Sequence, residues 1–256
     1  GVIVLKKDSY DGRLIREIEI PKLRGTKVEQ QKFLFTLNKG FQVFPPFSNK
    51  IVEDPPKFEP TRGTKTHYPS GIPELDEILG GEGYPRGCSV LYELGENVPV
   101  EALNSVINPT VANFIMRKRG VVIIPIAEHG PDDIRKMVSS FTGEEKFDEF
   151  ARIITYNNPL SDQNKPFTVT MPDPGIEPIE AIQDARVSYI ETAVEMARKF
   201  NKNLLHLHGG DSLAIAMKRF TPAMIGQSVV TIKMIKDLLI FISKPSLSEL
   251  TKVLAD

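Results

Sequence analysis

Residues 67–95 of the chain read HYPSGIPELDEILGGEGYPRGCSVLYELG and end in an apolar run. That run, Ser89–Leu94, predicts a β-strand. A helical region follows from about Val100 to Lys118. We expect Pro109 to interrupt this helix, because proline removes one backbone hydrogen bond and clashes with the preceding turn.

The alternation of strands and helices continues towards the end of the chain. Further strands are predicted at Gly120–Ile126, Ala151–Thr155, Leu204–His208 and Leu238–Ile242. Further helices are predicted over 131–141, 176–200 and 222–236. Strands that alternate with helices are joined by crossover connections and pair in parallel. The sequence therefore predicts an α/β fold with a mainly parallel, doubly wound sheet flanked by helices.

The first part of the chain has a different pattern. Strand-like runs occupy residues 2–7, 13–20, 32–37 and 40–44. The first two runs flank turn residues and predict a β-hairpin. We expect these antiparallel strands at one edge of the parallel sheet.

Three segments follow from this division. Residues 1–47 hold the antiparallel strands, and residues 48–66 predict a surface connector because they are rich in proline and charge. Residues 67–256 hold the α/β core. We expect the strands and the core to form one combined domain.

The composition excludes several classes of protein. The 256 residues carry 32 Lys and Arg against 33 Asp and Glu, a net charge of -1, which gives no bulk attraction to nucleic acid or to an acidic membrane. The sequence contains no apolar run of about 18 residues that would span a bilayer. The apolar start is too short for a signal peptide, and one cysteine forms no internal disulfide. We therefore expect a cytoplasmic protein with no membrane association.

Several motifs carry a resemblance to a known family. In the stretch quoted first they are Gly71, Leu75, Asp76, Gly80, Gly81, Pro85, Arg86 and Gly87. Elsewhere they are Pro131–Lys136 with Ser140-Phe141, and Pro21–Thr26 with Phe33–Phe35, Gly40 and Val43–Pro45. Together these residues resemble the KaiC/RecA-like P-loop ATPases. The resemblance covers most of the chain and implies a RecA-like fold.

The order of these motifs differs from that of the family. The motif at Pro21–Thr26 resembles strands that close a RecA-like domain, yet it comes first here. The tail Leu250–Asp256 resembles the segment that precedes those strands. The chain is therefore interpreted either as one permuted domain or as a piece that spans two tandem domains. Permutation predicts that residues 1–7 form a strand beside the sheet position that follows the C-terminal segment.

The resemblance places a degenerate phosphate-binding loop at residues 95–102, GENVPVEA. A working loop reads G-x-x-x-x-G-K-[ST], in which the lysine neutralises phosphate oxygens and the hydroxyl binds Mg²⁺. Gly95 is retained, whereas Val100, Glu101 and Ala102 replace the second glycine, the lysine and the hydroxyl residue. We expect no cofactor, and ATP with Mg²⁺ is disfavoured.

Two acidic residues match catalytic positions of the family as vestiges. Glu128 corresponds to the residue that activates the attacking water, and a solvated carboxylate at a strand end is the alternative. The Mg²⁺-supporting aspartate aligns either with Asp211 or, along the apolar strand, with His208. His206 and His208 share a strand face, so with His129 they form a zinc-site candidate. Ordinary hydrogen-bonded histidines are the favoured alternative, and no metal is expected.

The resemblance also gives a role to Lys22, Arg24 and Thr26. In the family this segment reaches across a subunit interface towards the neighbour's nucleotide, and an arginine supplied in this way stabilises a phosphoryl transition state. The resemblance therefore implies a homo-oligomer, or a hetero-oligomer with a KaiC-like paralogue. A solvated basic turn between strands is the alternative.

Three functions are compatible with these observations. The favoured one is a catalytically inactive, regulatory or scaffolding RecA-like protein that completes a neighbour's site. The first alternative is a residual nucleotide-binding ATPase. The second is a DNA- or RNA-binding module that uses the polar stretch 157–174 and the basic residues 117–119, although no aromatic residues are interleaved with them.

Overall fold

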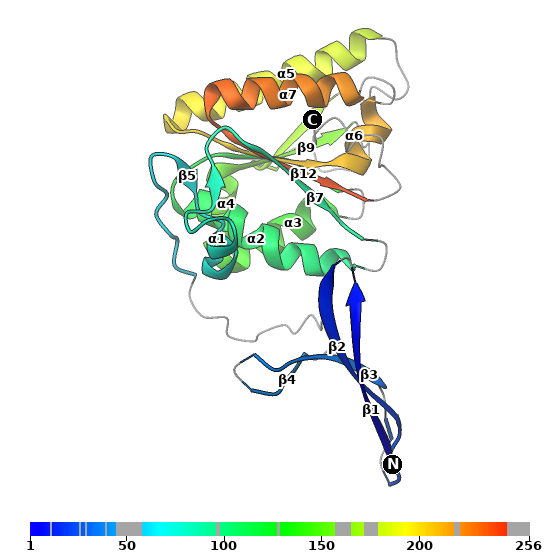
Figure 1. The fold of residues 1–256 in the computed structure, drawn as a ribbon. Coiled ribbons are helices and arrows are strands. Elements are labelled where there is room, and N and C mark those ends of the chain that lie inside the picture. Colours follow the sequence, from blue (N-terminus) through cyan, green and yellow to red (C-terminus); the bar gives the residue numbers. More distant parts are fainter. Residues whose placement is uncertain are drawn as a thin grey trace. The chain divides into compact units, whose positions relative to one another are not determined.

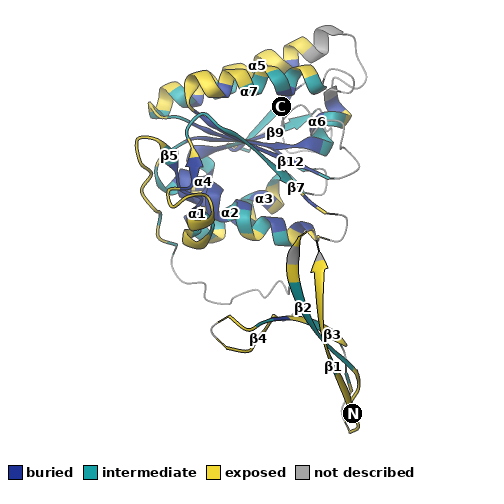
Figure 2. Cartoon of the chain, viewed as in Figure 1, coloured by how far each residue is buried: buried dark blue, intermediate teal, exposed yellow. Residues whose placement is uncertain are grey.

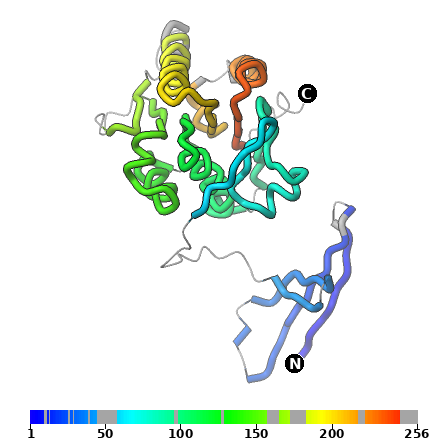
Figure 3. The backbone as a smooth tube through the Cα atoms, turned by 90° about the vertical axis from the view of Figure 1, so that its left-hand side faces the viewer, coloured from blue at the N-terminus to red at the C-terminus, as the bar shows by residue number. Residues whose placement is uncertain are grey.

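The computed structural model describes most of the chain. The described residues are 1–10, 12–25, 27–28, 30–38, 40–44, 58–95, 98–126, 129–156, 165–171, 179–217 and 221–244. They divide between two compact units, Gly1–Val52 and Glu53–Asp256, which are described separately below. Figure 3 traces the backbone from the N-terminus to the C-terminus.

The first unit is an antiparallel sheet. Its strands are β1 (Val2–Tyr10), β2 (Arg13–Lys22), β3 (Lys32–Thr36) and β4 (Gln42–Phe44), in that spatial order. The predicted hairpin is confirmed, since β1 and β2 pair antiparallel. Figure 2 shows much of this sheet as exposed. Phe35 is the one buried side chain among its described residues.

The second unit contains a parallel sheet of six strands. These are β7 (Ser89–Glu93), β8 (Val121–Ile124), β9 (Ala151–Tyr156), β10 (Thr168–Met171), β11 (Leu205–Gly209) and β12 (Leu238–Ser243). Their spatial order is β10-β9-β8-β11-β12-β7, and every pair is parallel. The predicted α/β class is therefore confirmed. Among the described residues, the strands β1–β4 form a sheet of their own and pair with neither edge of this one.

Helices cover both faces of the parallel sheet (Figure 1). They are α1 (Pro73–Ile78), α2 (Val100–Met116), α3 (Pro131–Thr142), α4 (Glu144–Phe150), α5 (Ile179–Phe200), α6 (Gly210–Met217) and α7 (Thr221–Ile235). One core lies on the side of α2 to α4 and includes Phe114, Phe147 and Leu207. A second core, on the side of α5 to α7, includes Met196 and Phe241. In the described part of the chain no helix is long and apolar enough to cross a membrane.

The glycine-rich stretch packs against the second unit's first core. Its short strands β5 (His67–Tyr68) and β6 (Tyr84–Pro85) pair antiparallel around α1. The carboxylate of Asp76 is buried and accepts a hydrogen bond from the Ser70 amide at 2.7 Å. Gly83 has a φ of 87°, and a Cβ atom there would lie 2.8 Å from the Asp76 carboxylate. The motif therefore needs glycine at this position to close the turn over a buried acid.

Pro109 does not interrupt α2, so that prediction is wrong. The helix runs from Val100 to Met116 with Pro109 inside it. Pro109 is buried, and the neighbouring Thr110 hydroxyl donates to the Val106 carbonyl at 3.3 Å. Core packing around the proline therefore holds the helix together despite the lost backbone hydrogen bond.

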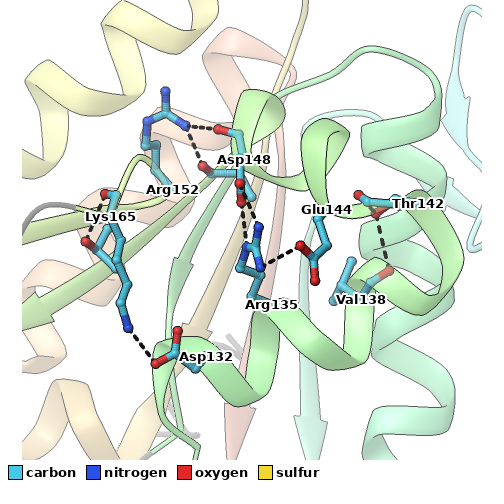
Figure 4. A network of polar contacts seen from close by, with 11 residues as sticks. Asp132, Arg135, Val138, Thr142, Glu144, Asp148, Arg152 and Lys165 are labelled. Atoms are coloured by element: carbon cyan, nitrogen blue, oxygen red, sulfur yellow. Dashed lines mark hydrogen bonds and ion pairs between the residues drawn. The ribbon is translucent and has the colours of Figure 1, made fainter. Parts of the chain in front are cut away.

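Six elements of the second unit were missed by sequence patterns: α1, α4, α6, β5, β6 and β10. The strand β10 lies within the polar stretch 157–174 and pairs with β9, so this part of the stretch belongs to the sheet. The helix α4 follows α3 after one residue, Gly143, and Figure 4 shows how the two are joined. Arg135 of α3 donates to both Asp148 carboxylate oxygens, at 2.7 and 2.8 Å, and lies 3.2 Å from Glu144. The hydrogen bonds to Asp148 raise the pKa of Arg135.

The prediction for the first strand is met in part. Residues 1–7 contain most of β1, so the strand itself is confirmed. The tail 250–256, which was expected to precede this strand, lies outside the described residues. The permuted and tandem interpretations therefore both stay predictions.

Candidate functional site

The segment predicted to be a degenerate phosphate loop lies between the end of β7 and the start of α2. The Val98 amide donates to the Gly95 carbonyl at 3.0 Å, and Pro99 precedes the helix in an extended conformation. The Ala102 amide donates to the Pro99 carbonyl at 3.0 Å. Residues 96–97 lie outside the described part of the chain. Gly95, Glu101 and Ala102 thus lie at one strand–helix junction, where parallel α/β proteins bind phosphates.

The side chains at this junction differ from those of the phosphate-loop motif. Val100 is buried in the core, where a phosphate loop has a glycine. Glu101 is exposed in the first turn of α2, and the positive end of the helix dipole favours a negative charge there. The helix end therefore carries its own carboxylate, and Pro99 has no amide hydrogen to donate.

The described part of the chain includes one of the two candidate catalytic acids. Glu128 lies outside the described residues. Asp211 lies in the first turn of α6, and its carboxylate accepts a hydrogen bond from the Ser212 amide at 2.8 Å. His208, the other position that aligned with the aspartate, is a buried residue of β11. The match of the Mg²⁺-supporting aspartate to Asp211 or to His208 therefore stays a prediction with two alternatives.

The two strand histidines belong to a buried hydrogen-bonded chain, defined here as Asp237, His206, Tyr189 and His208. The Asp237 carboxylate lies 3.0 Å from His206 Nε2 and also accepts from the Leu204 amide at 3.0 Å. The Tyr189 hydroxyl lies 2.6 Å from His206 Nδ1 and 2.8 Å from His208 Nε2. When both imidazoles are uncharged, the hydrogen bonds all run in one direction. His208 donates to the Tyr189 hydroxyl, Tyr189 donates to His206, and His206 donates to the Asp237 carboxylate.

Burial sets the protonation of this chain. Loss of hydration, together with the neighbouring His206, lowers the pKa of His208 to about 3. Burial raises the pKa of Tyr189 well above its usual value. His208 and Tyr189 are therefore both uncharged at neutral pH. Sequence reasoning missed Tyr189 and Asp237; the signals were a tyrosine among small residues on the inner face of α5 and an acid directly before an apolar strand.

The three candidate zinc ligands do not converge. His206 and His208 face α5 and α7, whereas His129 lines a small space on the side of α2 and α3. Asn104 Nδ2 donates to His129 Nε2 at 2.9 Å, so this ring carries its proton on Nδ1. The described residues hold no group of three side chains that could bind a metal.

A cavity of about 280 Å³ lies between α5, α7 and the sheet face that carries the histidines. We call it the α5–α7 cavity. Its lining includes Ile124, Met171, Tyr189, Ala193, His208 and Met224.

The residues of the predicted trans-acting segment lie in the first unit. Lys22 ends β2, Arg24 lies in the turn that follows, and both are exposed. Thr26 lies outside the described residues. The role of these residues at a neighbour's nucleotide therefore stays a prediction.

A cluster of basic residues lies at the end of the parallel sheet at which its strands begin. Arg86 and Arg119 both lie over the ring of Tyr68, at 4.5 and 5.2 Å from its centroid. Lys202 donates to the carbonyl of Arg117 at 3.0 Å. Burial and the positive charges of Arg119, Arg117 and Lys118 lower the pKa of Lys202. We call these residues, Arg86, Arg117, Lys118, Arg119 and Lys202, the basic edge.

The sheet order, the helices on both faces and the strand–helix junction between β7 and α2 are those of a RecA-like α/β protein. This confirms the resemblance to KaiC/RecA-like proteins. The chain belongs to the GvpD family, since the family model described as GvpD basic region 2 matches residues 57–253.

Individual relatives support this assignment. Proteins GvpD1 and GvpD2 of Halobacterium salinarum are each 30% identical to the chain, over 165 and 170 residues. These alignments cover 62% and 64% of the chain, which spans about a third of either relative (31% and 34%). The circadian clock oscillator protein KaiC of Thermosynechococcus vestitus is 31% identical over 81 residues, 32% of this chain and 14% of KaiC.

Proposed function

We propose that the chain is a RecA-like regulatory or scaffolding module that does not hydrolyse ATP. The observation that carries the proposal is the start of α2, where a buried valine, an exposed glutamate and an alanine replace the three residues that hold phosphate and Mg²⁺. At about 4 Å and an effective dielectric of about 20, two unit charges interact by about 4 kcal/mol. Glu101 would therefore repel a phosphate where a lysine would attract it.

The proposal includes an oligomer, made of this chain alone or together with a KaiC-like paralogue. The support is the resemblance, in which subunits act on each other's nucleotides, and the exposure of Lys22 and Arg24. In such an assembly a subunit without its own phosphate site still supplies cationic groups to its neighbour. The alternative, a residual nucleotide-binding ATPase, requires Glu128 and Asp211 to act without the loop lysine.

Calorimetry with ATP and Mg²⁺ tests the inactive site. We expect no binding by the wild-type chain at millimolar ATP, and at least tenfold tighter binding by Glu101→Lys, because the charge at the start of α2 is reversed. The matched control is Glu74→Lys, the same change at an exposed position in the first turn of α1. Tight ATP binding with turnover by the wild-type chain would contradict the proposal.

The basic edge favours nucleic-acid binding as a second candidate function. Five cations from three segments of the chain gather there, and like charges in contact are costly unless an anion offsets them. Tyr68, the aromatic ring beneath the arginines, is only 2% exposed, so it has no face on which a base could stack. The surface would therefore read phosphates and not sequence.

Charge reversal at the basic edge tests this second function. We expect the double variant Lys118→Glu and Lys202→Glu to bind a single-stranded oligonucleotide more weakly. The slope of the logarithm of affinity against the logarithm of salt concentration should fall in magnitude by about 1.4, because two phosphate contacts are lost. Both side chains are exposed, as is Lys136 on α3, whose replacement by Glu is the control. A mobility shift at several salt concentrations measures the effect. Equal losses in both variants would remove this candidate.

A further inference from the structure

The α5–α7 cavity lies away from the phosphate loop and has a lining of its own. Most of the lining is apolar, and two methionines, Met171 and Met224, contribute to it together with Tyr156 and Tyr189. Thioethers make favourable contacts with aromatic rings and adapt to their shape. An engineered cavity of about 150 Å³ binds benzene, so a space of about 280 Å³ suits a molecule of about two fused rings.

The polar part of the lining carries one permanent charge. Arg186 is the one residue with a permanent charge among the described residues that line the cavity, and it is exposed at the rim. The carboxylate of Asp237, behind His206, is already hydrogen-bonded to His206 and the Leu204 amide. A charged ligand would lose its hydration inside the cavity and gain no counter-charge there. The cavity therefore favours a neutral molecule.

The wall carries several hydrogen-bond acceptors, beside the Tyr156 hydroxyl and the Gln227 side-chain amide, which can also donate. The hydroxyls of Ser228 and Thr231 already donate to the carbonyls of Met224 and Gln227, both at 2.9 Å, and keep free lone pairs. The Tyr189 hydroxyl has one proton and lies within hydrogen-bonding distance of two imidazoles, so its oxygen also keeps a lone pair. A ligand with a hydrogen-bond donor therefore finds several acceptors on this wall.

We propose that the α5–α7 cavity is a binding site for a neutral aromatic molecule of about two fused rings with a single N–H or O–H donor. The apolar lining would enclose the rings, and Tyr189 or the α7 hydroxyls would accept the hydrogen bond. An apolar cavity into which a small number of polar groups point is typical of small-molecule sites. The site is independent of the phosphate loop, so it stands whether or not ATP binds.

Indole is the probe that tests the site. The chain contains no tryptophan, so indole fluorescence can be followed without a tryptophan background. We expect indole to bind with a dissociation constant below about 1 mM. Indene, which has the same shape without the N–H, should bind about fivefold more weakly. Indole-2-carboxylate should not bind at the same concentrations, because its charge would be buried.

Two cavity-filling variants locate the binding. Ala193→Leu on α5 and Ser228→Leu on α7 each place a larger side chain in the cavity, so we expect at least a tenfold loss of indole affinity. Ile107→Val, in the core on the other face of the sheet, is the control and should keep wild-type affinity. Should both filled variants fail to fold, Tyr189→Phe serves instead and should reduce the preference for indole over indene.

Each result decides the proposal. Loss of binding in the filled variants, or loss of the indole preference in Tyr189→Phe, supports it. Absence of indole binding by the wild-type chain overturns it, as does binding that neither the filled variants nor Tyr189→Phe alter. Calorimetry with indole on the same samples gives the stoichiometry, which should be one molecule per chain.

Discussion

Replacement of Gly209 by alanine is expected to lower the free energy of unfolding by more than about 4 kcal/mol, among the largest effects of a single substitution. Gly209 is the last residue of β11. The backbone segment that follows β8, at Pro125 and Ile126, passes very close to it. A Cβ atom at Gly209 would lie 2.6 Å from the Pro125 carbonyl carbon and 2.7 Å from the Ile126 amide nitrogen. Both are backbone atoms, so relief requires movement of a central strand.

Gly95→Ala is the matched control, because the described residues bring just the Val98 side chain near its new Cβ atom, at 3.7 Å. We expect it to change stability by less than about 1 kcal/mol. Chemical denaturation of both variants, followed by circular dichroism, measures the difference. Similar stabilities for the two variants would show that the strands around Gly209 separate easily, contrary to the packing described here.

Between pH 8 and pH 5 the chain should lose about 2 kcal/mol of stability through His208 alone. The pKa of this histidine is lowered from 6.5 to about 3 in the folded protein by burial. As the pH falls below 6.5, the unfolded chain takes up a proton that the folded chain does not. Stability is therefore fully present above pH 6.5 and declines until the pH reaches the folded value.

The difference between the wild-type chain and His208→Gln isolates this contribution, because the other titrating groups are shared. We expect the variant to show a pH dependence that is weaker by about 2 kcal/mol over the same interval. The control is Ile124→Val, which changes the residue opposite His208 on β8. It should lower stability without altering the slope. Denaturation at several pH values decides the matter, and an unchanged slope in His208→Gln would mean that the folded protein binds this proton.

The sheet was predictable because its signal is local. Each buried strand is a short apolar run, as at Leu238–Ser243, and each long helix repeats its apolar residues on one side. The interruption of α2 was predicted wrongly, since burial of Pro109 is a tertiary effect that no local rule contains. The strand β10 has polar threonines and is recognised only through its pairing with β9.

The candidate sites were predictable to different extents. The residues of the predicted phosphate loop follow one another in the sequence, so their differences from the motif can be read directly. The chain from Asp237 to His208 joins residues from α5, β11 and the start of β12, and the pairing of β11 with β12 brings them together. The α5–α7 cavity likewise depends on the spacing of two helices, which the sequence pattern does not specify.

The antiparallel sheet of the first unit has a calorimetric consequence. Apart from Phe35, its described side chains are at least partly exposed, including Leu5, Leu34 and Phe41 at 63%, 49% and 56%. The heat capacity of unfolding arises mainly from apolar surface that becomes hydrated. A sheet that already exposes such surface adds little to that quantity, so the heat-capacity step of the whole chain should be nearly that of the second unit alone.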